Sequence, residues 1–312
     1  MNDVPPVCDY EGSDYQSRFW THGGRAYEDG AERVALRRLL PARGERGGRL
    51  LEIGAGAGRL TGEYAGYDEV VLVDYSRTLL GEARARLGDG AEGGPHYTYV
   101  AANVYKLPFE PATFGAAVMV RVIHHMADVP RALAQIRAAL APGALFVLEF
   151  ASKQHLKAIA RWALRRQAWN PFAPEPVEFA ELNFDFSPAW MRARLAEAGF
   201  TPGRRLTVSH FRAGLVKRLV PSGVLVALDS AAQLTGDLWQ LTPSVFVRCT
   251  VPGAPRLRPR AVGGQPAAPL QFHCPECAAP LPVPVDDLFR CSACGRAWRY
   301  AGGLYDFREP AA

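Results

Sequence analysis

Residues 49 to 150 alternate short apolar runs with amphipathic stretches, and this alternation constrains the fold more than any other feature of the 312-residue chain. We predict strands at 50–53, 70–73, 97–101, 116–120 and 144–150, and helices starting at residue 59 and over 77–87 and 130–140. Strands of β-branched and apolar residues separated by helices form a parallel sheet that is covered on both faces. A later apolar run, Val245 to Val251, is expected to close this sheet. The predicted class is therefore α/β, with a doubly wound and mostly parallel sheet.

The remaining sequence suggests a division into four parts. We interpret residues 1–44 as an N-terminal helical cap, because the periodic run from Val34 to Leu40 predicts a helix that ends at Pro41. The main domain would span 45–251, with an insertion at about 151–190. Residues 252–270 hold five prolines and two adjacent glycines, which is typical of a linker. Residues 271–312 are too few to be held together by apolar burial alone.

Gly54, Gly56 and Gly58 follow the first predicted strand, where a helix should begin. Without Cβ atoms, the backbone can turn sharply there and come within contact distance of a ligand. A dinucleotide-binding loop would have glycine or alanine at position 59, but Arg59 stands there. The loop therefore suits a ligand that contains an adenosine but no diphosphate.

Two polar residues follow the next two predicted strands. Asp74 ends the second strand, and a carboxylate in this place can accept hydrogen bonds from both ribose hydroxyls of an adenosine. Asn103 follows the third strand and can offer its amide to an adenine edge. Because the carboxyl ends of parallel strands share one edge of the sheet, we expect these loops to converge on one ligand crevice.

At these residues the chain resembles the class I S-adenosylmethionine-dependent methyltransferases, in particular the branch that includes the ubiquinone and menaquinone C-methyltransferases. The resemblance covers residues 45 to 150. Its motifs are EIGAGAG at 52–58, Val73 with Asp74, Asn103 with LPF at 107–109, Phe114, and VIHHMAD at 122–128. Two positions depart from the pattern, since the family usually has aspartate at Asn103 and often at Gly115. The resemblance implies a Rossmann-like, seven-stranded sheet and an enzyme that transfers a methyl group from S-adenosylmethionine.

The resemblance also implies which residues bind the cofactor. Glu52 and the three glycines would flank its methionine part, Asp74 would bind the ribose, and Asn103 the adenine. The full expected set is Glu52, Gly54, Ala55, Gly56, Gly58, Asp74, Tyr75, Asn103, Val104 and Arg121. Tyr15 and Tyr27 are further candidates for cofactor neighbours, although aromatic residues at such spacing more often serve packing.

Two neighbouring histidines are the candidates for catalysis. Methyl transfer from a sulfonium chiefly needs positioning and a deprotonated acceptor, because the cofactor already carries an activated methyl group. His124 and His125 follow the fourth predicted strand, and an imidazole can act as a general base near neutral pH. The alternative is a histidine that only bonds to a backbone carbonyl and caps the helix starting near Asp128.

The sequence says less about the methyl acceptor than about the cofactor. Residues 151–220 hold 12 basic residues against five acidic ones, and residues 156–165 predict a helix with one apolar and one basic face. Such a helix can roof an acceptor pocket, rest on an anionic membrane surface or form a solvated cap. We expect a small-molecule acceptor or a lipid- or quinone-like one. The oligomeric state does not follow from the sequence.

Cys274, Cys277, Cys291 and Cys294 form two Cys-x-x-Cys pairs with 13 residues between them, the arrangement of a zinc ribbon. Four thiolates leave no open position, so we expect a structural zinc ion. A redox dithiol pair would need a thioredoxin-like surround that 42 residues cannot provide. Residues 271–310 also resemble the small zinc-ribbon protein that activates tRNA and protein methyltransferases, which implies a stabilising or substrate-docking role. With four basic and five acidic residues, the ribbon is a poor match for phosphates, so nucleic acid is not the favoured partner.

No apolar run approaches the roughly 20 residues that cross a bilayer, and the first residues lack a basic start and an apolar stretch. We therefore expect no transmembrane helix, no secretory signal and a cytoplasmic location. The predicted function is S-adenosylmethionine-dependent methyl transfer. One alternative is a non-enzymatic protein that senses this cofactor or docks RNA through its ribbon. Another is a nicotinamide-dependent oxidoreductase, against which Arg59 and the missing Tyr-x-x-x-Lys argue.

Overall fold

The computed structural model describes residues 4–12, 24–90, 92–254 and 269–311. Its strands are β1 (Arg49–Ile53), β2 (Glu69–Asp74), β3 (His96–Ala101), β4 (Phe114–Met119), β5 (Leu140–Ala151), β6 (Val177–Ala180), β7 (Asn183–Asp185), β8 (Thr201–Val208), β9 (Ser244–Thr250), β10 (Leu288–Arg290), β11 (Ala297–Ala301) and β12 (Leu304–Asp306). Its α-helices are α1 (Ala26–Leu39), α2 (Arg77–Leu87), α3 (Val129–Ala139), α4 (Leu156–Ala163), α5 (Pro188–Glu197), α6 (Gly214–Leu219) and α7 (Ser222–Ala232). Short 3-10 helices are η2 (Arg43–Glu45), η3 (Thr61–Tyr64), η4 (Val104–Lys106), η5 (Ile123–His125) and η6 (Gln233–Asp237). Tyr15 and most of the expected linker lie outside the described residues.

Seven strands form the expected sheet, in the order β3-β2-β1-β4-β5-β9-β8. Strands β3, β2, β1, β4 and β5 pair in parallel, and β9 runs antiparallel between β5 and β8. The prediction of a mostly parallel α/β sheet is confirmed. The carboxyl ends of β1, β2 and β4 therefore meet at one edge, the place where ligands bind in open α/β sheets.

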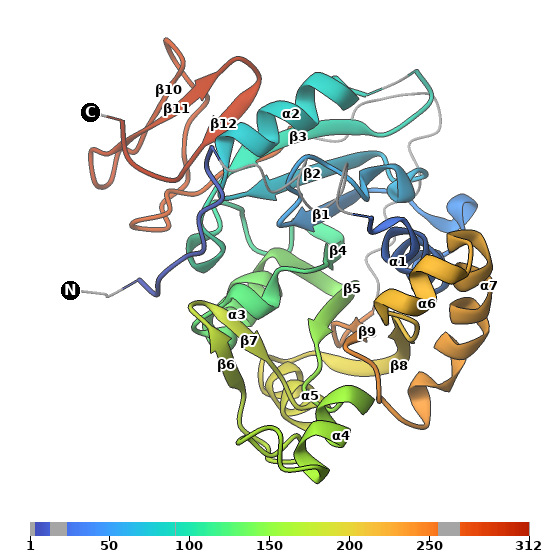
Figure 1. The fold of residues 1–312 in the computed structure, drawn as a ribbon. Coiled ribbons are helices and arrows are strands. Elements are labelled where there is room, and N and C mark those ends of the chain that lie inside the picture. Colours follow the sequence, from blue (N-terminus) through green and yellow to red (C-terminus); the bar gives the residue numbers. More distant parts are fainter. Residues whose placement is uncertain (1–3, 13–23, 91, 255–268, 312) are drawn as a thin grey trace.

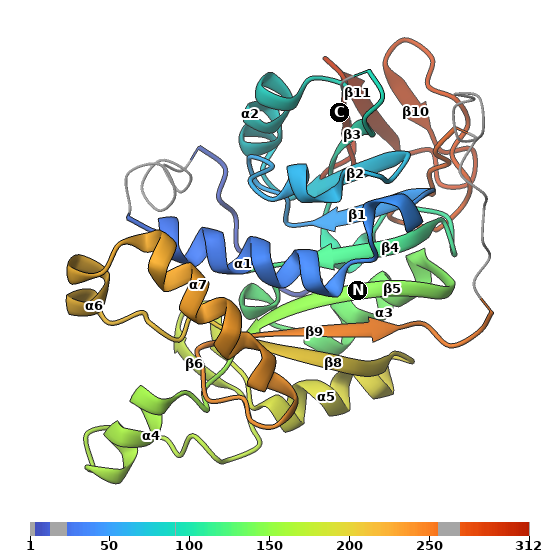
Figure 2. The ribbon, with the colours of Figure 1, turned by 90° about the vertical axis from the view of Figure 1, so that its right-hand side faces the viewer.

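Helices cover both faces of the sheet because successive side chains of a buried strand point to opposite sides. In β1, Leu50 packs with α1, α2 and α7, whereas Leu51 and Ile53 pack with α3 and α5. Figures 1 and 2 show α1 and α7 on one side of the sheet and α3 on the other. Tyr27 of α1 is buried, and its hydroxyl donates a hydrogen bond to Asp229 of α7, so this tyrosine serves packing.

The prediction of a helix that starts at Arg59 is wrong. The chain forms turns and then the short 3-10 helix η3, before Gly66 turns it toward β2. Gly58 has a φ of 72°, a left-handed conformation that no helix continues, and glycine at position 62 further lowers the propensity for a helix. Leu60 and Tyr64 of this segment are nevertheless buried in the core.

The C-terminal ribbon (residues 271–311) continues the sheet. Strand β12 pairs in parallel with β3, with Leu304 opposite Tyr99 and Asp306 opposite Ala101, and β11 and β10 follow as further strands. Phe272, Phe289, Trp298 and Phe307 of the ribbon belong to the same buried cluster as the sheet residues on that face. The ribbon (orange to red in Figure 1) is thus part of the main body of the molecule.

Between β5 and β8 lie α4, the hairpin β6–β7 and α5. The predicted helix with an apolar and a basic face is α4, and it leaves Leu156 and Leu164 each 65% exposed. In the part of the chain that the structure describes, no helix has both the length and the apolar character needed to cross a membrane.

Candidate functional site

A cavity with about 1020 Å³ of empty space, part of it open to solvent, lies at the carboxyl edge of β1, β2 and β4. Of the residues expected at the site, those that line it are Glu52, Gly54, Ala55, Asp74, Tyr75, Val104, Arg121 and His125. Gly56, Gly58, Asn103 and His124 are not among the lining residues. The structure therefore brings most of the expected set together around one space.

The glycine loop enters the cavity because its backbone is folded back on β2. The N–H groups of Gly54 and Ala55 both donate to the carbonyl oxygen of Val73, at 2.7 and 3.0 Å. Gly54 has a φ of 68°, and a Cβ at this position would lie 2.1 Å from Cγ2 of Val122. Glycine is thus required at Gly54 both by conformation and by space.

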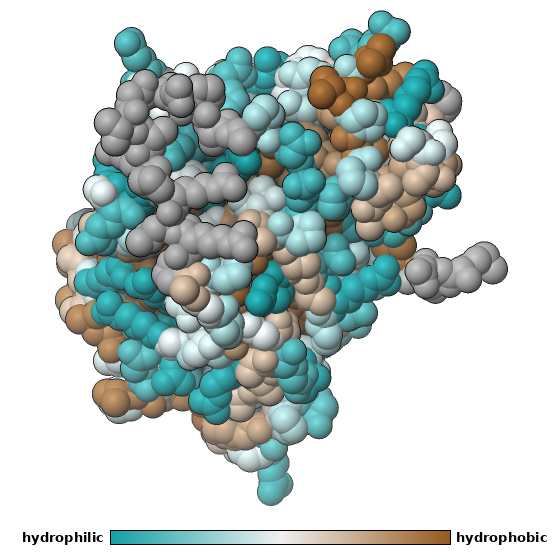
Figure 3. Space-filling view, turned by 180° about the vertical axis from the view of Figure 1, so that it is seen from behind, coloured by the Kyte–Doolittle hydropathy of each residue, from teal (hydrophilic) through white to brown (hydrophobic). Residues whose placement is uncertain are grey.

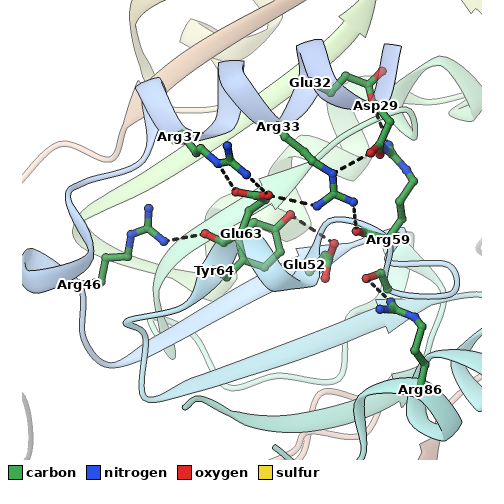
Figure 4. Close-up of polar contacts among 11 residues, drawn as sticks. Asp29, Glu32, Arg33, Arg37, Arg46, Glu52, Arg59, Glu63, Tyr64 and Arg86 are labelled. Carbon is green, nitrogen blue, oxygen red and sulfur yellow. Dashed lines mark hydrogen bonds and ion pairs between the residues drawn. The ribbon is translucent and has the colours of Figure 1, made fainter. Parts of the chain in front are cut away.

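Arginines clamp the glycine loop from two helices. Arg86 of α2 donates to the carbonyl oxygens of Ala57 and Gly58, at 2.8 and 2.6 Å, and Arg33 of α1 donates to that of Arg59 at 2.7 Å. Figure 4 shows these arginines on either side of the loop. Since the carbonyl oxygens are held, the loop is fixed in shape before any ligand arrives.

Arg59, which departs from a dinucleotide-binding pattern, is held by acids of α1. Its guanidinium binds Asp29 and donates to Oε2 of Glu32 at 2.7 Å. Nε of Arg121 donates to the other oxygen of Glu32 at 2.6 Å. Burial alone would raise the pKa of Glu32, but Arg121 and Arg59 outweigh it and hold the pKa below its ordinary value. Arg59 thus joins the glycine loop to α1.

Glu52 is a buried carboxyl group at the end of β1 (Figure 4). It accepts a hydrogen bond from Oγ1 of Thr61 at 2.6 Å and one from the hydroxyl of Tyr64 at 3.2 Å. Burial raises the pKa of Glu52 to about 7, although both hydrogen bonds act in the opposite direction. This group therefore changes charge near neutral pH at the wall of the cavity.

Asp74 lies at the end of β2, where its carboxylate faces the glycine loop. Oδ2 accepts a hydrogen bond from the N–H of Gly56 at 2.8 Å, and Oδ1 accepts one from the N–H of Ser76 at 2.9 Å. Burial raises the pKa of Asp74, while these backbone donors favour the charged form. Each carboxylate oxygen has capacity for a second hydrogen bond, so the pair can accept two hydroxyl groups of a diol.

Asn103 caps the short helix η4. Its Oδ1 accepts a hydrogen bond from the N–H of Tyr105 at 2.9 Å, which orients the loop that follows β3. Its neighbours Ala102 and Val104 supply the apolar wall of the cavity there. The side-chain oxygen of Asn103 thus already accepts a hydrogen bond within its own loop.

Arg121 follows β4 in a left-handed conformation, with a φ of 60°. Its N–H donates to Oε2 of Glu149 at 2.8 Å, and burial raises the pKa of that glutamate. A non-glycine residue with positive φ is strained, and such strain is often kept at functional sites. The surrounding acids hold this turn in place at the cavity wall.

The two histidines differ in their surroundings. Nδ1 of His125 lies 3.0 Å from the carbonyl oxygen of Leu182, which can only accept, so Nδ1 carries the proton. Nε2 then accepts a hydrogen bond from the hydroxyl of Tyr10 at 3.1 Å. Burial lowers the pKa of His125 below its ordinary value. Nδ1 of His124 is buried and meets no hydrogen-bond partner among the described residues, and burial, followed by the nearby His125, lowers its pKa well below the usual range.

Sequence reasoning missed one wall of the cavity. Val7, Cys8 and Tyr10 line it from a segment that precedes α1, and we call residues 7–11 the N-terminal strap. The strap has no helical or strand periodicity, and its contacts are with residues about 70 to 300 positions away. The one available signal was an aromatic residue, Tyr10, next to acids.

The four cysteines of the ribbon lie together, with their Sγ atoms all within 4.8 Å of one another. The Sγ atoms of Cys274 and Cys294 are 3.6 Å apart, and those of Cys277 and Cys291 are 3.4 Å apart. Tetrahedral zinc with Zn–S bonds of about 2.3 Å has S–S edges of roughly 3.8 Å. The four thiols therefore fit a zinc ion in both chemistry and spacing.

Comparison with known sequences gives a match to part of the chain. Residues 51–148 match a family model described as a methyltransferase domain. The O-methyltransferase cnsE of Penicillium expansum is 36% identical over 114 residues, which cover 36% of this chain and 40% of that protein. The 2-phytyl-1,4-naphtoquinone methyltransferase of Trichormus variabilis is 33% identical over 125 residues, covering 38% of this chain and 54% of that protein. The matches thus span about half the length of these curated relatives.

Comparison with solved structures extends over more of the chain. One solved structure is a complex between the Haloferax volcanii Trm112 methyltransferase activator and a protein described as a methyltransferase. One chain of this complex aligns with a TM-score of 0.51 and 13% identity, over 77% of the present chain and 98% of its own length. A Listeria monocytogenes protein described as an S-adenosylmethionine-dependent methyltransferase aligns with a TM-score of 0.51 and 14% identity, over 73% and 99% of the two chains. At such identity the likeness shows the fold alone, which is the Rossmann-like α/β fold of these proteins.

Proposed function

We propose that this chain, whose residues 51–148 match a methyltransferase domain, is an enzyme that transfers a methyl group from S-adenosylmethionine to a small apolar acceptor. One observation carries the proposal. The carboxylate of Asp74 and the clamped glycine loop face one cavity at the carboxyl edge of the sheet. A diol acceptor beside a loop that has Arg59 where a dinucleotide-binding loop has glycine or alanine fits an adenosine that is linked to an amino acid.

The cavity offers a partner for each part of the cofactor. Asp74 would accept the two ribose hydroxyls, and Ala102 and Val104 would contact the adenine. Gly54 and Glu52 would border the methionine part, next to Arg121. The cofactor supplies an activated methyl group on a sulfonium sulfur. The protein therefore has to orient the two reactants and accommodate the proton that the acceptor loses.

We infer that Tyr10 and His125 receive that proton. The hydroxyl of Tyr10 can take a proton from the acceptor while it passes its own to Nε2 of His125, whose Nδ1–H stays bonded to Leu182. Because burial lowers the pKa of His125, this pair is a weak base. It suits an acceptor that is itself acidic, such as a phenol or an enol. The role of His124 stays a prediction, since it does not line the cavity.

The surface beside the cavity supports an apolar acceptor. Helices α4, α6 and α7 lie near the carboxyl edge of the sheet in Figure 2, and they expose large apolar side chains that include Leu156, Leu219 and Leu228. Figure 3, seen from behind, shows brown apolar surface at the left margin, where α7 lies. Basic residues such as Lys157 and Arg218 lie among them. Both curated relatives described above are methyltransferases, and the name of one specifies a quinone. A quinol-like or phenolic acceptor is consistent with these features.

We further propose that the ribbon holds a structural zinc ion through Cys274, Cys277, Cys291 and Cys294. The spacing of the Sγ atoms supports this assignment. With four thiolates the ion has no open position, so it would stabilise the ribbon and take no part in methyl transfer.

Calorimetric titration with S-adenosylmethionine, with NADH as the control ligand, tests the cofactor. We expect micromolar binding of S-adenosylmethionine alone. Asp74→Ala should weaken that binding at least about tenfold, because hydrogen bonds to a carboxylate are lost, whereas Asp74→Asn keeps an acceptor for Gly56 and should lose less. Equal affinities in the wild type and Asp74→Ala would refute the ribose assignment.

The acceptor is tested with labelled S-adenosylmethionine. Reduced 2-phytyl-1,4-naphtoquinone and a simple phenol serve as acceptors, and an alkyl amine of similar size serves as the control. Label transferred to the quinol or phenol, and not to the amine, is the expected result. Transfer to the amine alone would contradict the proposed acidic acceptor.

A further inference from the structure

The N-terminal strap and the end of the ribbon contact one another beside the cavity. The strap supplies Val7, Cys8 and Tyr10 to the cavity wall. On its outer side, Asp9 and Glu11 face Arg308, which follows the last ribbon strand. In Figure 1 the strap (dark blue) runs down beside β12. Two segments from opposite ends of the sequence thus meet at the ligand site.

Arg308 makes the central contact of this arrangement. Its side chain is only 7% exposed, and Nη1 donates to Oε2 of Glu11 at 2.6 Å, while Nη2 lies 3.5 Å from Oδ2 of Asp9. Its guanidinium carbon lies 4.2 Å from the ring centroid of Tyr75, which lines the cavity. Glu11 and Asp9 are 33% and 41% exposed, but the guanidinium that bonds to both is buried, which fixes one side of the contact.

The sheet fixes the position of Arg308. The N–H of Phe307 donates to the carbonyl oxygen of Ala101 at 2.8 Å, which extends the pairing of β12 with β3. Oδ1 of Asp306 accepts from the N–H of Arg308 at 3.2 Å, and Oδ2 of Asp306 binds Nε of Arg77 at 2.6 Å. The guanidinium therefore extends from a rigid part of the molecule toward the strap.

Glu11 connects this contact to the wall of the cavity. Its carboxylate accepts hydrogen bonds from the N–H groups of Arg77 and Thr78, at 2.8 and 3.0 Å, at the start of α2. On the cavity side of the strap, Tyr10 reaches across to Nε2 of His125. When Glu11 is held by Arg308, Val7, Cys8 and Tyr10 are held over the space that Asp74 and Tyr75 border.

We propose that Arg308 of the ribbon is a positioning residue for the cofactor: through Glu11 and Asp9 it holds the N-terminal strap against the cavity and so completes the binding site. The proposal rests on S-adenosylmethionine as the ligand. The ribbon then contributes to cofactor affinity through one side chain, beyond any stabilising effect of its metal.

The first experiment is a double-mutant cycle on the full, zinc-loaded chain. Affinity for S-adenosylmethionine is measured by calorimetry for the wild type, Arg308→Ala, Glu11→Gln and the double variant. Glu11→Gln keeps one acceptor oxygen, enough for one of the two N–H groups of α2, and removes the charge that Arg308 binds. We expect each single variant to bind about tenfold more weakly and the double variant to bind no more weakly than the weaker single one. Additive losses, or wild-type affinity in Arg308→Ala, would overturn the proposal.

Two controls separate positioning from loss of structure. Arg290→Ala removes an exposed arginine of the same ribbon and should bind the cofactor as the wild type does. Arg308→Lys keeps the charge and should recover part of the affinity. Zinc content and thermal stability are measured for every variant. If Arg308→Ala loses zinc, Glu11→Gln, which leaves the ribbon unchanged, decides the outcome.

A second readout does not depend on the cofactor. Cys8 lies on the strap, whereas Cys249 is fully buried. Release of the strap should raise the rate at which a thiol reagent labels Cys8 several-fold in Arg308→Ala and in Glu11→Gln, as located by mass spectrometry. Unchanged labelling in both variants would show that Arg308 does not hold the strap. If the wild type binds no S-adenosylmethionine, the proposed function fails, and the labelling still decides whether the strap is anchored by Arg308.

Discussion

Glu52 connects stability to pH through a single side chain. Its folded-state pKa of about 7 exceeds the 4.5 of the unfolded chain, so folding favours the protonated form. The stability it contributes is full below about pH 4.5 and is lost as pH rises through 7. Relative to Glu52→Gln, we expect the free energy of unfolding of the wild type to fall by about 3 kcal/mol between pH 4.5 and 8. Urea denaturation of both proteins across this range provides the measurement, and a pH-independent difference would contradict the raised pKa.

Gly54 and Gly56 allow the cost of backbone strain to be separated from the cost of a steric clash. Both have positive φ, 68° and 53°, but a Cβ on Gly54 would strike Val122, whereas one on Gly56 would meet nothing within 4 Å. We expect Gly56→Ala to cost about 1 kcal/mol of stability from strain alone. Gly54→Ala should cost about 1–3 kcal/mol more because of the contact. Chemical denaturation of the two variants tests this difference, and equal losses would mean that Val122 moves aside freely.

The sequence was most informative about residues whose role is local. The apolar runs placed six strands, and Ser76 and Gly88 flank a helix over 77–87 that was predicted at both ends. Asp74 and the glycines could be singled out as candidates because their chemistry follows from their places after strands. The prediction of a helix at Arg59 was wrong because it gave more weight to the amphipathic pattern than to the glycines around this residue. The strap could not be predicted, because Tyr10 and Glu11 contact residues that are far away in the sequence.

Among the elements, the ribbon depends on its four thiols for its own shape. Cys291→Ser should release zinc and loosen the turns that carry the cysteines, because a site with three thiolates binds the ion far less tightly. Elemental analysis gives the zinc content, with Cys8→Ser as the control that removes a cysteine outside the cluster. Retention of a full equivalent of zinc in Cys291→Ser would refute the four-thiolate site.

The placement of the ribbon could not be predicted from its cysteines. Its spacing identifies a metal-binding module, but pairing between β12 and β3 depends on an edge strand that is about 200 residues away in the sequence. Backbone hydrogen bonds carry no sequence signature of their partner. The aromatic residues Phe272 and Phe307, which pack against this face of the sheet, are equally typical of a separate small domain.

At the scale of the whole molecule, the ribbon protects an edge of the sheet. Without it, β3 would present unpaired backbone groups and Phe109 would lose its contact with Phe272, whose ring centroid lies 6.0 Å away. A chain ending at residue 253 should therefore self-associate, as exposed edge strands tend to do. Light scattering after size-exclusion chromatography measures this. A separate polypeptide of residues 269–312, added to the truncated chain, should reduce the association, and a truncated chain that does not self-associate would show that the edge needs no cover.

The contact between Glu11 and Arg308 joins residues that are 297 positions apart. During synthesis, the strap leaves the ribosome before its partner, which arrives only after the 297 positions between them have been made, roughly 15 to 60 seconds later at 5–20 residues per second. The parallel sheet can form in the meantime, but the wall of the cavity is completed last. On the proposal that Arg308 positions the strap, a chain released before Arg308 is made would bind its ligand poorly, so that ligand affinity reports that translation has passed the last ribbon strand.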